Sequence, residues 1–121
     1  MKVLRFGWLC LLLFIPAYAQ DKPAVADWQA GFAKTVITPA EPAWLSGYAS
    51  RTKPSEGVAQ DIYAKALALQ DQRGNRLVII TTDLIGIPHP LAEAVAEQAR
   101  QRYKLQRAQL LFAASHTHTG P

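Results

Sequence analysis

The chain contains a single cysteine, Cys10, which lies in an apolar stretch near the N-terminus. Lys2 and Arg5 precede this stretch, and Ala17-Tyr18-Ala19 follows it with small residues at the two positions that a signal peptidase recognises. We therefore predict that residues 1–19 are a signal peptide and that the protein is exported, to the periplasm or out of the cell. The mature chain then has no cysteine, which excludes a disulfide framework.

The sequence also lacks a long apolar run, a strong net charge and any repeat. The apolar stretch over residues 9–15 is shorter than the roughly 20 residues that span a bilayer. The formal charge of +4 falls to +2 once Lys2 and Arg5 are removed with the signal peptide. Most remaining basic residues are scattered, and a group over 100–107 is interpreted as the solvated end of a helix. No nucleic-acid motif is present, and we expect no nucleic-acid partner.

Hydrophobic patterns over the mature residues, 20–121, predict one domain or part of one, of class α/β with a mixed sheet. The expected strands and the expected helix cover residues 28–37, 61–70, 77–80, 109–114 and, for the helix, 91–103. A turn over 71–75 predicts an antiparallel hairpin of the second and third strands. The third strand is apolar throughout, which is typical of a strand covered on both faces.

The helix between the last two strands predicts a right-handed βαβ crossover that joins parallel strands. Ile79 and Leu111 should then lie on parallel strands beneath that helix. Asp83 and His116, which follow these strands, should lie at the same edge of the sheet. Asp83 could there orient a histidine by accepting its ring N–H, or help to hold an ion. The alternative is a carboxylate that anchors a loop or the start of the helix. His89, between two prolines, is expected in a surface loop before the helix.

The segment from Pro39 to Val58 is long for a connection and has no clear periodicity, which favours a binding loop or a docked one. We interpret Trp44 and Leu45 as side chains that cover an edge of the sheet. Tyr48 and Arg51 are candidates for the rim of a substrate site.

Two of the three histidines, His116 and His118, follow the last strand and are separated by one residue. In an extended segment their side chains would point the same way, with Cβ atoms roughly 7 Å apart. Such a pair can converge on a metal ion or flank a substrate carbonyl, and two surface histidines in a loop would show the same spacing. Metallo-β-lactamase-like sites need an aspartate and a histidine where Gly120 and Pro121 stand. Barrel amidohydrolases usually carry their His-x-His near the start of the chain.

Residues 114–121, Ala-Ser-His-Thr-His-Thr-Gly-Pro, resemble the signature of the neutral/alkaline, non-lysosomal ceramidases. Four upstream segments match in the same order, over residues 31–39, 47–49, 62–67 and 78–83. The resemblance covers nearly everything after about Trp28. Thr119 replaces the commoner serine, and Asp61 stands where some members carry a basic residue.

This resemblance implies hydrolysis of the amide bond of N-acylsphingosine with one zinc ion, Zn2+. His116 would be a zinc ligand, and His118 would lie beside the metal and contact the reacting end of the substrate. Zinc lowers the pKa of bound water to about 7, which provides a nucleophile at neutral pH. The partners implied are a ceramide-like lipid amide and, at the periphery, a membrane.

The family's other zinc ligands, a histidine, a glutamate and a tyrosine, lie downstream of the signature. We therefore expect residues 20–121 to be the N-terminal portion of a larger catalytic domain, a fragment inactive alone. The alternative is a non-catalytic exported α/β module that keeps the signature for structural reasons.

Overall fold

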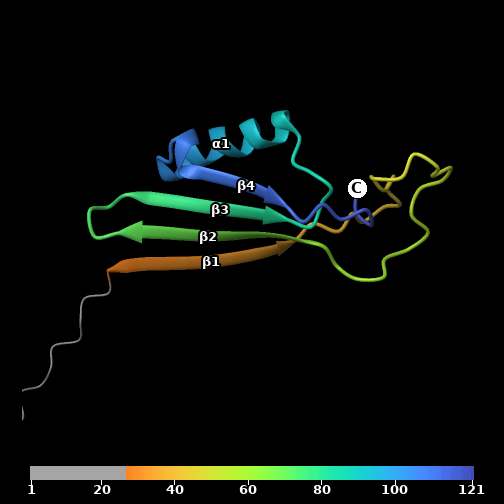
Figure 1. Cartoon of the computed structure of the whole chain (residues 1–121), viewed down its shortest axis with the longest axis horizontal. Coiled ribbons are helices and arrows are strands. Elements are labelled where there is room, and N and C mark those ends of the chain that lie inside the picture. Colours follow the sequence, from red (N-terminus) through yellow and green to blue (C-terminus); the bar gives the residue numbers. More distant parts are fainter. Residues whose placement is uncertain (1–26) are drawn as a thin grey trace, which may run out of the picture.

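The structure, a computed structural model, describes residues 27–121, and the predicted signal peptide lies outside this range. The elements in chain order are β1 (Trp28–Val36), β2 (Tyr63–Asp71), β3 (Arg76–Thr82), α1 (His89–Tyr103), the short 3-10 helix η1 (Arg107–Gln109) and β4 (Leu110–Ala114). They form one four-stranded sheet with α1 along one face (Figure 1). The predicted strands and helix are confirmed, with ends that differ by a few residues.

The sheet is mixed and its strands lie in chain order, β1-β2-β3-β4. β2 pairs antiparallel with β1 and with β3, whereas β4 pairs parallel with β3. The predicted hairpin, the βαβ crossover and the α/β class are therefore confirmed. Because β1, β3 and β4 run in the same direction, their carboxyl ends lie at one edge of the sheet (Figure 1).

The hairpin turn is closed by Asp71, the last residue of β2. Its carboxylate accepts hydrogen bonds from the backbone N–H groups of Arg73 and Asn75, at 2.9 and 2.8 Å. Gly74 has φ +82°, a conformation that glycine adopts without the penalty a Cβ would bring. The turn predicted over 71–75 therefore forms as local sequence chemistry requires.

Helix α1 begins at His89, so the prediction that His89 lies in a loop before the helix is wrong. Prolines are tolerated in the first turn because the N–H they lack would have no partner there, and Pro90 therefore does not delay the helix. Lys104 ends the helix in a left-handed conformation, with its N–H bonded to the carbonyl of Arg100. Within the described residues, no helix is long and apolar enough to cross a membrane.

The exposed side of α1 carries a cluster of polar side chains. Hydrogen bonds from Arg100 and then from Gln101 lower the pKa of the Glu97 carboxyl from 4.5 to about 2. Glu97 therefore stays ionised over the whole physiological range. The basic residues over 100–107 are exposed at the end of the helix, as predicted from the sequence.

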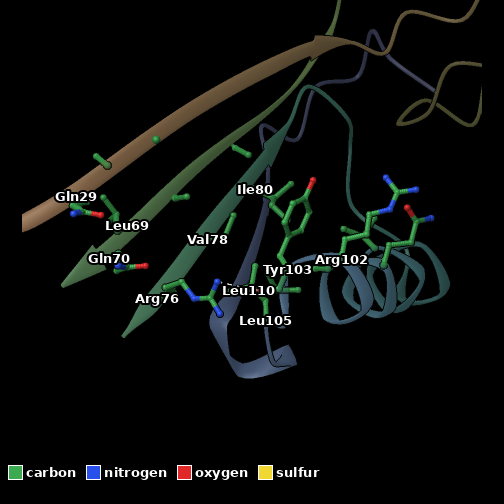
Figure 2. A pocket seen from close by; sticks show the side chains of 17 residues that line it. Gln29, Leu69, Gln70, Arg76, Val78, Ile80, Arg102, Tyr103, Leu105 and Leu110 are labelled. Carbon is green, nitrogen blue, oxygen red and sulfur yellow. Dashed lines mark hydrogen bonds between the residues drawn. The ribbon is translucent and has the colours of Figure 1, made fainter. Parts of the chain in front are cut away.

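The buried core lies where the crossover packs on β3 and β4. Ala96 of α1, Leu105 and Leu110 form a buried cluster, against which Val78 and Phe112 pack. Between α1 and the sheet, a groove of about 690 Å³ extends from this cluster over β1 and β2, where the side chains that line it are mostly small. Figure 2 shows Val78, Tyr103 and Leu110 around this groove.

The opposite face of the sheet is not covered by any element among residues 27–121 (Figure 1). Ile79 and Leu111 are register partners on parallel strands, as predicted, but their side chains point away from α1. Leu111 is 52% exposed, whereas the preceding Leu110 is 6% exposed. A row of apolar partners crosses all four strands on this face: Phe32, Leu67, Ile79 and Leu111. The predictions that Ile79 and Leu111 lie beneath the helix and that β3 is covered on both faces are therefore wrong for the described residues.

Replacing one leucine at a time should separate the two faces. We expect Leu110→Ala to lower the free energy of unfolding by about 2 to 4 kcal/mol, because a buried side chain leaves a cavity. Leu111→Ala should change it by no more than about 0.5 kcal/mol, as surface substitutions usually do. Urea unfolding of both variants measures the difference, and a larger loss for Leu111→Ala would contradict the observed register.

Candidate metal and catalytic site

The signature histidines lie beyond the end of β4, in a segment that is not extended. β4 ends at Ala114, and the N–H of Ser115 makes one further bond to the carbonyl of Thr82, at 2.9 Å. His116 then has φ +58°, a left-handed conformation that is uncommon for residues other than glycine. The premise of an extended His-x-His is therefore wrong, because the chain turns at His116. The two rings are nevertheless neighbours, with centroids 5.3 Å apart and planes tilted by 59°.

His116 is oriented by a backbone carbonyl from the segment after β3. Its Nδ1 lies 2.9 Å from the carbonyl oxygen of Ile85. A carbonyl oxygen can only accept, so Nδ1 carries the hydrogen and the neutral ring has its lone pair on Nε2. Metal-binding histidines are commonly fixed in this way, with one nitrogen bonded to a carbonyl and the other facing the ion. The ring of His116 is thus fixed with an unprotonated Nε2.

Asp83 lies at the same edge of the sheet as the histidines, but its carboxylate bonds elsewhere. Oδ2 accepts the backbone N–H of Tyr63 at 3.0 Å, and Oδ1 lies 3.5 Å from Nζ of Lys65. The backbone N–H of Asp83 also donates to the carbonyl of Tyr63. Asp83 therefore ties the end of β3 to the start of β2, and the structure does not bring it into hydrogen-bonding contact with His116.

Tyr48 and Arg51, the two candidates from the long loop, lie beside His118. The ring of Tyr48 meets the ring of His118 edge-on, with centroids 4.8 Å apart. Nη2 of Arg51 donates to the backbone carbonyl of His118 at 2.6 Å. The long connection between β1 and β2 is therefore docked against the signature.

Gly47 is a site residue that sequence reasoning missed. Its φ is +97°, and a Cβ at this position would collide with the ring of His118, 2.6 Å from Nδ1. Next to it, the N–H of Ser46 donates to the carbonyl of Gly120 at 2.9 Å. The match of residues 47–49 to the family was a signal for this glycine, but nothing local showed which side chain would approach it.

The remaining candidates lie away from the histidine pair. Trp44 is 59% exposed, in a loop that extends beyond the strand ends rather than along a sheet edge (Figure 1). The prediction that it covers an edge of the sheet is therefore wrong. Leu45 is half-buried in a hollow of about 460 Å³ that Thr119 and Pro121 also line. The side chain of His89 is 84% exposed, 3.9 Å from Glu93, so His89 is a surface residue.

The donor set near the signature suits a metal only in part. His116 offers a free Nε2, and His118 lies next to it. Among residues 27–121, however, no three side chains of histidine, cysteine, aspartate or glutamate are grouped so that they could hold an ion. The described residues therefore supply one imidazole that is oriented by a backbone carbonyl and a second imidazole beside it.

These residues define an α/β structure in which a pair of histidines lies beyond the carboxyl ends of the parallel strands of a mixed sheet. Residues 28–121 match the family described as neutral/alkaline non-lysosomal ceramidase, N-terminal. The chain belongs to this family, and the resemblance inferred from the sequence is confirmed.

Individual relatives agree with this assignment. A neutral ceramidase of Pseudomonas aeruginosa (strain PAO1) is 30% identical over an alignment of 122 positions, which covers 98% of this chain and 18% of that protein. A ceramidase structure described as complexed with C2 superposes with a TM-score of 0.73 at 28% identity, over 78% of this chain and 15% of the other. The crystal structure of neutral ceramidase from Pseudomonas aeruginosa gives 0.71 at 29% identity, over 78% and 16%. The chain thus spans less than a fifth of the length of these relatives.

The contact between Gly47 and His118 can be tested by adding one methyl group. Gly47→Ala should lower the free energy of unfolding by about 1 to 3 kcal/mol, because a strained backbone angle and a clash with the ring are imposed together. Gly57→Ala is the matched control, since a Cβ there meets nothing within 4 Å. Urea unfolding compares the two variants, and equal stability would show that the loop does not pack on His118 as described.

Proposed function

We propose that this chain contributes the histidine signature of a zinc-dependent amidohydrolase that cleaves the N-acyl amide bond of ceramide or a related N-acyl lipid. One observation carries the proposal. In a member of the ceramidase family, the Ile85 carbonyl holds the ring of His116 with Nε2 free, and the centre of the His118 ring lies 5.3 Å from the centre of the His116 ring. The substrate class rests on the family, whose members include the neutral ceramidases described above.

The two histidines have different surroundings, which supports different roles. His116 would hold zinc through Nε2, and a bound zinc ion polarises a carbonyl group and lowers the pKa of water. His118 makes its contacts with Tyr48, Gly47 and Arg51 and not with the Ile85 carbonyl. Its ring is held beside that of His116, where an N–H can stabilise negative charge on the reacting oxygen or hold a proton. We therefore assign His116 to the metal and His118 to the substrate.

Residues 27–121 are proposed to be insufficient for hydrolysis on their own. Catalytic zinc sites generally have three protein ligands, and no group of three is present among these residues. Further ligands would have to come from other parts of a catalytic domain such as those of the longer relatives. The competing proposal is a non-catalytic module in which the signature only joins the loop over 46–51 to the sheet.

Export and contact with a lipid surface are also part of the proposal. The sequence of residues 1–19 supports removal of a signal peptide, and a lipid amide substrate would bring the protein to the periphery of a membrane. Exported protein should begin at Gln20 when sequenced from its N-terminus. A mature protein that still begins at Met1 would contradict the assignment of residues 1–19.

A chimera can test the division of labour between the histidines. Residues 28–121 would replace the matching segment of the Pseudomonas aeruginosa neutral ceramidase. His116→Ala should lose bound zinc together with activity, because a strong ligand is removed. His118→Ala should retain most of the zinc and lose turnover by about 100- to 1000-fold, the usual effect of removing one donor to a developing oxyanion. His89→Ala is the control and should change neither.

Metal content by mass spectrometry and hydrolysis of a short-chain ceramide are the two measurements. Equal loss of zinc in the His116 and His118 variants would make His118 a ligand and refute the division. Full activity of the His116 variant would end the metal proposal. A folded chimera that binds no zinc and hydrolyses nothing would favour the non-catalytic module.

A further inference from the structure

Arg51 is the side chain through which the long loop is attached most directly to the signature. Its Nη2 donates to the backbone carbonyl of His118 at 2.6 Å, across 67 positions of the sequence. The side chain is half-buried, and a hydrogen bond from a charged donor is stronger than one between neutral groups. This bond fixes the backbone at His118 and not only the loop.

The same guanidinium also acts on the ring of His118 through Tyr48. The guanidinium carbon lies 5.3 Å from the centre of the Tyr48 ring, which is within the range of a cation–π contact. The N–H of Arg51 donates to the carbonyl of Tyr48 at 3.2 Å, so the two residues belong to one tight turn. The Tyr48 ring in turn meets the His118 ring edge-on at 4.8 Å. Arg51 therefore contacts His118 at its carbonyl and, through Tyr48, at its imidazole.

The two histidines are held from different parts of the chain. Ile85, in the connection between β3 and α1, fixes the ring of His116. Arg51 and Tyr48, in the connection between β1 and β2, fix His118. A change at Arg51 should therefore disturb the ring of His118 and leave the orientation of the His116 ring unchanged.

We propose that Arg51 is a positioning residue that sets the orientation of His118 relative to His116. This proposal deepens the function proposed above, because it assigns the residue that places the substrate-facing histidine. An arginine suits the task better than a lysine, since its planar group can donate to a carbonyl and stack on an aromatic ring at the same time. The ammonium of a lysine can make the hydrogen bond but provides no planar surface for Tyr48.

The full chain, labelled with 15N, can be examined by nuclear magnetic resonance without substrate or metal. The ring signals of the three histidines are assigned from single His→Gln variants. In Arg51→Met we expect the nuclear Overhauser contact between the Tyr48 and His118 rings to be lost and the ring signals of His118 to shift. The ring signals of His116 should keep the pattern of a hydrogen on Nδ1, and those of His89 should not move. Arg51→Lys should recover part of the Tyr48–His118 contact.

Arg73→Met is the matched control, because Arg73 is an exposed arginine in the turn between β2 and β3. It should leave all three histidines unchanged. An unaltered His118 in Arg51→Met would overturn the proposal, and so would a common shift of all three histidines, which would make Arg51 a general structural residue. If Arg51→Met does not fold, Arg51→Lys is compared with the unmodified chain, and identical His118 signals would overturn it.

These measurements separate the positioning proposal from the proposed function. The spectra report where His118 lies and involve no hydrolysis. An inactive chimera would therefore leave the role of Arg51 standing, and an unaltered His118 spectrum would leave the assignment to amide hydrolysis standing.

Discussion

The parallel pairing of β3 with β4 is the constraint on which the histidine pair depends. Thr82 and Ala114, the last residues of the two strands, are register partners. The segments that follow them therefore leave the sheet side by side, which brings the Ile85 carbonyl to within 2.9 Å of the His116 ring. A slip by one residue would move His116 by about 3.3 Å and turn Leu110 out of the core. Burial of Leu110 beneath α1 thus also fixes the geometry of the site.

The second half of the site comes from a connection that would otherwise be an open surface loop. Its two ends are joined by the bond from the N–H of Ile37 to the carbonyl of Ile62, at 2.8 Å, and by the contact of Thr38 with Asp61. Between these ends, the turn over 46–51 reaches the signature through backbone and side-chain bonds. Docking of this kind explains how a segment without periodic pattern becomes ordered, since its polar groups find partners on the signature itself.

The sheet is covered unevenly among the described residues. Helix α1 buries the side of β3 and β4 that faces it, whereas the row from Phe32 to Leu111 on the other side remains open. Phe32 is 69% exposed, which is unusual for a phenylalanine in the middle of a strand. Contiguous exposed apolar surfaces of this kind typically mark contacts with another protein, a membrane or a ligand. Within residues 27–121, burial beneath α1 therefore explains the apolar side chains on one face of β3. The apolar side chains on its other face are not covered by any element of this range.

Local sequence alone determined the order of the strands and the helix, the turn at Asp71 and the crossover. Each of these features depends on residues that are close in the sequence. The strands and the helix follow from hydrophobic patterns, the turn from its residue types, and the crossover from a helix that lies between two strands. The placement of Asp83 and His116 at one edge followed from that topology. The family signature was likewise readable from the sequence, and it indicated the chemistry.

Only the tertiary structure decided which groups meet at this edge. The bond of His116 to Ile85, in place of Asp83, and the contact of Gly47 with His118 join segments far apart in the chain. The left-handed backbone of His116 turns the chain where these contacts form. Alternation in a strand shows that Leu110 and Leu111 face opposite ways, but not which of them α1 covers. These features depend on which surfaces pack together, because the free energy of burial and of long-range hydrogen bonds is not encoded in any local pattern.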